Sequence, residues 1–369
     1  MQIWKNIIRI ISLFLIFILV SCGVDDNNES SKQTTNIDQY KNAEDSWYAD
    51  KTTIQGKTQG TTFVVKTSED TLLTTPNELS ELLKGFDLQL SGYISNSTLS
   101  KFNASNKDEP IDISLHPQFE LCYNLSQDIY KRTNGAFDPS VFPLVKAWGF
   151  FKEMNDSPTA SEIDSILEFT GFDNNEHHAL ENGMLKKIDS RFELDFNAIA
   201  QGLSVDYLAE ILEEKGHENY FIEIGGEIRT KGVNDDDKPW IVGIDQPTRE
   251  NDGSNARKLE NYLSLDNLSV ATSGNYRKFY EKDGKRYSHT LNPETGYPVK
   301  HNLLSATVIA ESAAKADAYA TAFMTMGVQR TMEFVKNNSD LKIEVYLLFE
   351  NNEGRIERAY SDGFSQYFL

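Results

Sequence analysis

The sequence predicts a mixed α/β fold, because segments with helical periodicity alternate along the chain with short β-prone runs. Amphipathic helices are expected over residues 77–90, 116–132, 199–212 and 312–326. Two of the expected strands, 278–280 and 286–291, are joined through Lys282-Asp283-Gly284-Lys285, which is typical of a hairpin. The chain has 369 residues, of which 39% are hydrophobic and 25% charged, an ordinary globular composition.

The first residues have the pattern of a secretory signal. Lys5 and Arg9 precede an apolar run from Ile10 to Val20, which is too short to span a bilayer. The run closes with Leu19-Val20-Ser21-Cys22, which resembles a bacterial lipobox; the alternative is a plain signal peptide followed by an unrelated cysteine. We expect residues 1–21 to be removed and Cys22 to carry lipid. The protein would then be anchored to a membrane of the bacterial cell envelope, facing the periplasm or the exterior.

The mature chain should be an acidic domain on a flexible tether. The formal charge of −20 becomes −22 when residues 1–21 are removed, so a nucleic-acid partner is excluded. Residues 22–49 are polar, acidic and nearly free of aliphatic side chains, so they are expected to form a tether, with the folded domain spanning residues 50–369. With Cys22 lipidated, Cys122 has no disulfide partner and should be a buried, apolar-like residue.

The first half of the domain supplies strands and helices around short polar motifs. A strand over residues 59–65 is entered through Gly60, and the helix at 77–90 leads to Ser91-Gly92-Tyr93. The helix at 116–132 stops at Thr133-Asn134-Gly135, before Ala136-Phe137-Asp138-Pro139. Residues 151–182 are more acidic and are expected to form helices and loops without a chemical role.

A central stretch, residues 194–232, joins a carboxylate, a helix, a strand and a glycine pair. Asp195 precedes the helix that begins at Ile199, and Lys215-Gly216 ends it. The strand Tyr220–Ile224 follows and ends at Gly225-Gly226, where the main chain can approach another group closely. Taken alone, the stretch also fits an ordinary helix-loop-strand unit.

The last third of the chain is expected to be richer in strands. Strands are predicted over residues 240–245 and 343–349, and a third strand is predicted to end near residue 274. The polar residues 246–261 are predicted to form a surface loop. The alanine-rich helix at 312–326 should end at Gly327. Asp317 and Thr321 share one face of that helix; such a pair is often solvated, but the flanking alanines argue for burial.

Several of these motifs, in collinear order from Gln59 to Gly327, resemble the FAD:protein FMN transferase (ApbE) family. They include Asp195 with Ala198-Ile199-Ala200-Gln201-Gly202, then Gly225-Gly226-Glu227, and Ser288-His289-Thr290-Leu291-Asn292-Pro293-Glu294-Thr295-Gly296. Gln201 and Asn292 stand where the family frequently has Lys and Asp. The resemblance implies a single two-lobed α/β domain with a flavin cleft between the lobes.

The resemblance also implies the site residues. Positions expected to contact FAD are Gln59, Tyr93, Ala136, Phe137, Asp138, Asp195, Gln201 and Leu291. A Mg²⁺ shell is implied for Asp317, Thr321 and the main-chain oxygen of Ala198, which are the hard oxygen ligands that this ion prefers. His289 is the candidate general base, and Asp195, the second catalytic candidate, could orient the flavin or help hold the metal. For His289 and Tyr93 a purely structural role is the alternative.

The implied reaction transfers the FMN half of FAD to a Thr or Ser hydroxyl of an acceptor flavoprotein, such as a membrane redox-complex subunit or an FMN-binding domain, and releases AMP. Two alternatives stay open at this point. Water in place of the hydroxyl would make the protein a Mg²⁺-dependent FAD pyrophosphatase. A lipoprotein that only binds flavin would have no need of the metal ligands.

Overall fold

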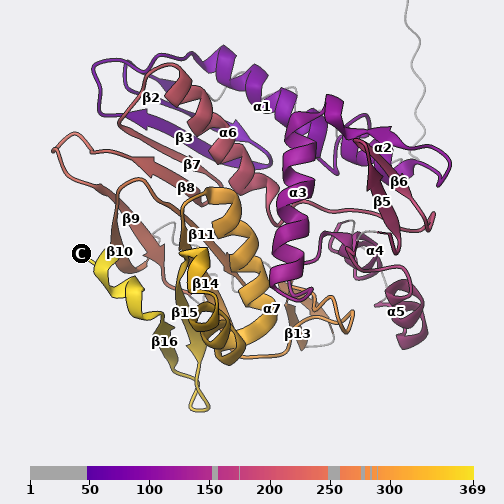
Figure 1. The fold of residues 1–369 in the computed structure, drawn as a ribbon. Helices are drawn as coiled ribbons and strands as arrows, with labels where there is room; N and C mark the ends of the chain where they lie inside the picture. Colours follow the sequence, from indigo (N-terminus) through magenta and orange to yellow (C-terminus); the bar gives the residue numbers. More distant parts are fainter. Residues whose placement is uncertain are drawn as a thin grey trace, which may run out of the picture. The chain divides into compact units, whose positions relative to one another are not determined.

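The computed structural model describes residues 48–151, 157–173, 175–247, 258–275, 279–282, 285–288 and 290–369. These residues fall within one compact unit, Asn42–Leu369. They form two groups of elements, a large sheet with its helices and a smaller group around α3 (Pro117–Arg132), α4 (Phe142–Ala147) and α5 (Ala160–Leu167) (Figure 1). No helix in this part of the chain combines the length and the apolar character that a membrane crossing requires.

A nine-stranded, wholly antiparallel sheet forms the larger group, in the order β1-β2-β3-β7-β8-β11-β14-β15-β16. The strands are β1 (Tyr48–Ala49), β2 (Thr53–Thr58), β3 (Thr61–Thr67), β7 (Tyr220–Ile224), β8 (Glu227–Lys231), β11 (Ser269–Gly274), β14 (Leu303–Ala310), β15 (Glu344–Glu350) and β16 (Ile356–Tyr360). The described part of the chain begins with Tyr48 in β1, and the expected domain start at residue 50 stays a prediction.

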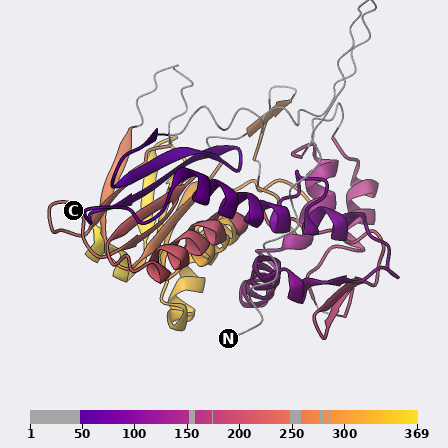
Figure 2. The same cartoon turned by 90° about the horizontal axis from the view of Figure 1, so that it is seen from above.

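Helices cover one face of this sheet. They are α1 (Pro76–Leu90), α6 (Ala200–Glu214) and α7 (Ala313–Asn337), and Figure 2 shows them together on the same side. Alternate residues of β7, such as Ile222 and Ile224, pack against Val205 and Leu208 of α6. The predicted helices are thus confirmed in outline, with ends that move by one or two residues at α1, α3 and α6.

The other sheet face is covered in part by a separate hairpin, β9 (Trp240–Asp245) with β10 (Leu259–Leu265). Their inner residues, including Val242 and Leu263, form a second core with Val270 of β11 and Phe364 of the 3₁₀ helix Asp362–Tyr367. The prediction of a surface loop over residues 246–261 is therefore wrong at its end, because Leu259–Asn261 already pair with β9.

The smaller group contains a three-stranded sheet and four helices. Its strands are β4 (Ile111–Asp112), β5 (His178–Glu181) and β6 (Met184–Lys187), and its helices are α2 (Thr98–Ala104), α3 (Pro117–Arg132), α4 (Phe142–Ala147) and α5 (Ala160–Leu167). Within residues 151–182 the structure confirms a helix, α5, but β5 corrects the expectation of helices and loops alone. Cys122 of α3 is fully buried, as predicted.

Two local features in the last third of the chain can be compared with the sequence prediction. Gly327 has φ 75° and ψ 177°, so it interrupts α7 as expected, but the helix resumes and continues to Asn337. The predicted hairpin is present as β12 (Phe279–Lys282) and β13 (Lys285–Ser288), paired antiparallel.

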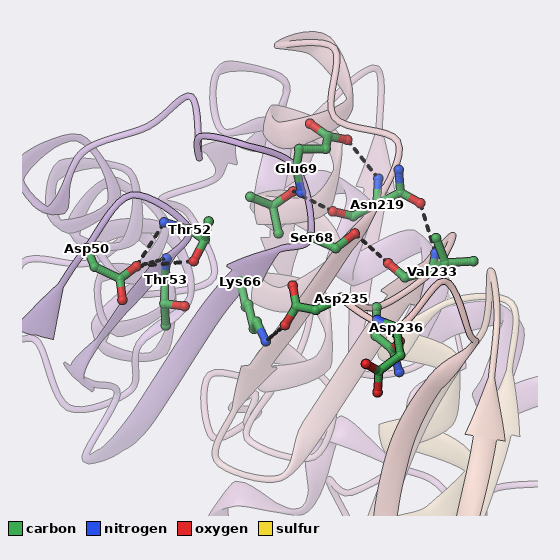
Figure 3. A network of polar contacts seen from close by, with 12 residues as sticks. Asp50, Thr52, Thr53, Lys66, Ser68, Glu69, Asn219, Val233, Asp235 and Asp236 are labelled. Atoms are coloured by element: carbon green, nitrogen blue, oxygen red, sulfur yellow. Dashed lines mark hydrogen bonds and ion pairs between the residues drawn. The ribbon is translucent and has the colours of Figure 1, made fainter.

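Polar contacts fix the edge of the sheet next to the β8–β9 connection (Figure 3). Asn219 accepts a hydrogen bond from Val233 N (2.8 Å) and donates its own N–H to Glu69 Oε1 (3.0 Å). Ser68 Oγ donates to Val233 O (2.7 Å), and Lys66 pairs with Asp235. The Asn219 side chain also occupies the space that a side chain at Gly232 would need, since its Oδ1 lies 2.2 Å from where a Cβ on that glycine would sit, and Gly232 has φ 64°.

Candidate active site

A cavity of about 310 Å³ lies where the two groups of elements meet. Its lining comes from both: Tyr93, Ala136, Phe137, Asp138, Pro139, Val141, Val145 and Phe150 on one side, and Asp195, Asn197, Ala198, Ser273, Gly274, Thr290, Leu291, Pro293, Asp317, Thr321 and Thr325 on the other. The cavity thus brings together most of the residues that the sequence singles out. The two-lobed arrangement with a cleft between the lobes is confirmed.

The segment before α6 is held by hydrogen bonds from the smaller group. The Asn103 side chain donates to Leu194 O and accepts from Leu194 N, each at 2.8 Å. Asp195 N then donates to Pro139 O at 2.7 Å. These bonds place Asp195 next to the Ala136–Asp138 segment, because they fix the backbone on either side of the carboxylate.

Asp138 and Asp195 are carboxylates in the cavity wall. Desolvation raises the pKa of Asp138 to about 6, although its Oδ1 accepts hydrogen bonds from the N–H and the hydroxyl of Ser140 at 2.7 and 2.6 Å. Desolvation also raises the pKa of Asp195, whose Oδ1 accepts from Asn197 N at 2.8 Å. Both side chains are therefore partly removed from water, as residues that orient a ligand must be.

Asp317 and Thr321 lie on adjacent turns of α7 and both face the cavity. Asp317 is 6% exposed, and its Oδ2 accepts a hydrogen bond from Gly202 N at 3.1 Å. Burial raises the pKa of this carboxyl well above its ordinary value. Thr321 Oγ1 lies 3.2 Å from Ser273 Oγ at the end of β11.

These residues fit a hard divalent cation. Burying a carboxylate is unfavourable, and a bound cation would offset that cost. The donor set consists of one carboxylate, one hydroxyl and the main chain at Ala198, all of which border the same cavity. No group of three or more His, Cys, Asp or Glu side chains suited to a metal occurs in the described part of the chain, so a cation here would need ligand and water oxygens as well.

The loop between β13 and β14 closes one side of the cavity. Asn292 Oδ1 accepts from the N–H groups of Glu294 (2.9 Å) and Thr295 (3.2 Å), a role that needs only a side-chain oxygen and suits Asn as well as Asp. Gly296, with φ 73°, accepts from Trp148 Nε1 at 2.8 Å. His289 lies outside the described residues, but Thr290 and Leu291 line the cavity.

Gln59 and Gln201 do not line this cavity. Gln59 is in the β2–β3 turn, where its amide donates to Asp87 Oδ1 (3.1 Å) and accepts from Ser204 Oγ (3.3 Å). Gln201 packs on the Gly225 main chain, and its Nε2 lies 2.4 Å from the position that a Cβ on Gly225 would occupy. Their contact with FAD stays a prediction. Tyr93 is 60% exposed at the rim, where it stacks on Phe151 with ring centroids 5.0 Å apart.

Ser273 and Thr325 also line the cavity, although the sequence motifs do not mark either as a site residue. Thr325 follows Asp317 and Thr321 at the same spacing of four residues, so helical periodicity carried the signal for it. Ser273 had no such signal, because its place beside Thr321 depends on the packing of β11 against α7.

The chain is similar to proteins of known function over most of its length. The sequence model described as "ApbE family" matches residues 59–347. The FAD:protein FMN transferase of Haemophilus influenzae is 34% identical over 84% of this chain and 89% of the relative, and that of Vibrio cholerae is 34% identical over 85% and 92%.

Solved structures agree with the sequence relatives. The flavin transferase ApbE from Vibrio cholerae superposes with a TM-score of 0.74 at 32% identity, covering 87% of this chain and all of that one. The apo flavinyl transferase ApbE of Pseudomonas stutzeri gives a TM-score of 0.74 at 30% identity, with 86% and 97% covered.

Proposed function

Because the chain belongs to the ApbE family, we propose that it transfers the FMN half of FAD to a hydroxyl group of an acceptor protein and releases AMP. The observation that carries this function is the cavity between the lobes. It joins Asp138 and Asp195 to the Asp317–Thr321 pair, in the collinear order of the family motifs. A protein that only stores flavin would not need a buried carboxylate on α7.

The reaction is a displacement at phosphorus. The oxygen of an acceptor Thr or Ser forms a bond to the phosphorus of the FMN half, and the bond from that phosphorus to the bridging oxygen of the pyrophosphate breaks. AMP leaves with the bridging oxygen and its electron pair, and the hydroxyl proton passes to a base. The product is FMN joined to the acceptor through a phosphodiester, so atoms and charge balance.

Asp317, Thr321 and the Ala198 carbonyl would hold Mg²⁺. When bound, this ion would neutralise charge on the pyrophosphate and so favour the departure of AMP. The chain's own contribution is to fix the ligands, since Gly202 N holds Asp317 and Ser273 contacts Thr321. Asp195 would orient the flavin from the same wall as these ligands, and Asp138 from the facing wall.

His289 is proposed as the base that takes the hydroxyl proton. One observation supports this role, because the next two residues in the chain, Thr290 and Leu291, border the cavity. Histidine is also the side chain that most often serves as a general base. Cys22 is proposed as a lipid attachment site that would anchor the enzyme to the cell envelope. The tether expected ahead of the domain would then let the domain reach a membrane-bound acceptor.

Intact-protein mass spectrometry tests the function. A candidate flavoprotein from the same organism, incubated with the full chain, FAD and Mg²⁺, should gain the mass of FMN less water, with one AMP released per transfer. Free FMN and AMP without added mass on any acceptor would establish the pyrophosphatase reaction instead. Bound FAD that stays intact would leave flavin binding alone.

A further inference from the structure

A second, larger groove lies on the sheet face opposite α6 and α7. Its volume is about 630 Å³, and residues of the sheet and of the β9–β10 hairpin line it. The lining residues are Thr62, Phe221, Glu223, Gly225, Gly226, Ile228, Ile241, Val242, Gly243, Asp245, Leu259, Thr272 and Gly274. Phe221 and Glu223 alternate along β7 with Ile222 and Ile224, which pack on the helices, so the groove is on the other face.

Gly274 joins this groove to the flavin cavity, because it lines both. The preceding residues of β11 show the two faces of the strand. Ser273 is directed to Thr321 on the helix side (3.2 Å), whereas Thr272 Oγ1 lies 2.8 Å from Thr307 Oγ1 and borders the groove. At the end of β11, therefore, a single strand without a side chain at position 274 separates the groove from the cavity.

We propose that this groove binds the segment of the acceptor protein that carries the reacting Thr or Ser. The inference rests on the proposed function, because it assigns a place to the protein substrate of that reaction. A segment lying in the groove would bring its hydroxyl group past Gly274 to the cavity that holds the pyrophosphate. The flavin takes up the cavity, so the acceptor segment needs a place of its own. The groove, with about twice the volume of the cavity, provides that place.

The lining of the groove suits an extended polypeptide. Gly226 and Gly274 carry no side chain, and no atom lies within 4 Å of the position that a Cβ on Gly226 would occupy, so another backbone can approach closely there. Ile241 and Leu259 border the groove with 51% and 40% of their surfaces exposed, which is suited to an apolar side chain of the partner.

The test introduces a charge at the groove without touching the flavin cavity. Ile241→Glu changes an exposed side chain on the outer face of β9, and Tyr262→Glu is the matched control. Tyr262 lies on the same face of the hairpin, opposite Gly243, and is 49% exposed, but it does not line the groove. The acceptor probe is a purified FMN-binding domain that gains FMN from the wild-type enzyme by intact mass.

Ile241→Glu should raise the KM for this acceptor by about tenfold or more, because an apolar contact is replaced by a desolvated charge. Its Kd for FAD, measured by flavin fluorescence, should stay unchanged, and Tyr262→Glu should leave both constants unchanged. Leu259→Gln provides a second groove variant and should raise KM in the same direction.

The outcomes separate the two proposals. Equal KM values for Ile241→Glu, Leu259→Gln and Tyr262→Glu would overturn the groove assignment while transfer by the wild type stands. A weakened Kd for FAD in the groove variants would assign the groove to the nucleotide instead. If the wild-type chain transfers FMN to no acceptor, the proposed function fails first, and the groove assignment fails with it.

Discussion

The main-chain N–H of Gly202 donates a hydrogen bond to Oδ2 of Asp317, with 3.1 Å between nitrogen and oxygen. This bond joins the first turn of α6 to the second turn of α7. Asp206, one turn further along α6, accepts hydrogen bonds from Ala313 N and Ala314 N at 2.9 Å each. The two helices are therefore locked where they present Ala198 and Asp317 to the cavity.

Asp317→Ala should abolish FMN transfer without unfolding the protein. The variant removes the single charged ligand assigned to Mg²⁺. Gly202 N–H loses its acceptor, but the cost of burying the carboxylate is removed as well and Asp206 still joins the two helices, so the melting temperature in the absence of metal should change little. Mn²⁺ binding by electron paramagnetic resonance should be lost together with transfer. Turnover at ordinary Mg²⁺ concentrations in this variant would remove Asp317 from the site.

Gly202→Ala should destabilise the protein by roughly 1–3 kcal/mol and slow transfer. A Cβ at this position would lie 2.3 Å from the carbonyl oxygen of Ala313, and a backbone atom cannot move aside without shifting α7. Gly85→Ala in α1 is the matched control, because no atom lies within 4 Å of its Cβ position. The control should gain roughly 0.5–1 kcal/mol, as Ala favours a helix over Gly. Equal unfolding free energies for the two variants would contradict the close packing.

His289→Asn should still bind FAD but lose about 10²-fold or more in transfer rate, the usual size of a general-base contribution. In the wild type, transfer should fall as the pH drops through the titration of the imidazole, and the variant should lack that limb of the profile. Stopped-flow or quenched assays on one acceptor domain across pH 5–9 would show it. An unchanged rate would return His289 to a structural role.

His178 should make the fold sensitive to mild acid. Its ring is buried between Phe172 and Phe192, with centroids at 4.9 and 4.6 Å, and its Nε2 lies 2.8 Å from Tyr123 Oη. Desolvation lowers the pKa of His178 from 6.5 to about 4. Between these two values the unfolded chain binds a proton that the folded chain does not. The stabilisation is thus complete above pH 6.5 and is lost as the pH falls, by about 2 kcal/mol at pH 5.

The measurement has to isolate this group, since other groups act in the opposite direction. Desolvation raises the pKa of Asp87 and of Asp138 to about 6, so their protonation favours the folded state between about pH 4 and 6. The unfolding free energy of the wild type should therefore be compared with that of His178→Phe, from urea titrations at pH 7.5 and 5. Between pH 7.5 and pH 5 the unfolding free energy of the wild type should fall relative to that of His178→Phe. A difference that does not change with pH would refute the assignment.

Cys22→Ser should release the protein from the membrane. We expect the mature native protein to begin at a lipid-modified Cys22 and to sediment with membranes, and the variant to lose the lipid mass. The N-terminal peptide by mass spectrometry is the direct readout. Recovery of cytoplasmic protein that still begins at Met1 from the native host would overturn the anchoring.

The helices and the cavity were largely predictable from the sequence, whereas the edges of the sheets were not. Strand β2 contains Gly56 and several polar residues, and four of the five residues of β16 are exposed, so neither carries the apolar alternation of a half-buried strand. Strand β10 begins inside a polar segment. Its apolar residues Leu259 and Tyr262 face outward, so they do not mark a buried face. These residues form strands because they pair with neighbouring strands. The sequence of one segment does not reveal that pairing.

Within the site, helical periodicity correctly placed Asp317 and Thr321 on one face of α7, where both border the cavity, and their role as metal ligands stays a prediction. The sequence was less informative for residues whose place depends on turns. Gln59 adopts a left-handed backbone (φ 51°) in the β2–β3 turn. Its side-chain amide donates a hydrogen bond to Asp87 and accepts one from Ser204. The sequence also could not show that Gly225 is small because Gln201 packs against it.

The end of β11 has an evolutionary consequence. Odd-numbered positions near this end face the helices and the flavin cavity, and even-numbered positions face the β9–β10 hairpin. Substitutions on the hairpin side can therefore accumulate without disturbing Asp317 or Thr321. After a gene duplication, one copy could drift toward a new protein client through changes at Ile241, Leu259 and their neighbours, while both copies keep the same chemistry.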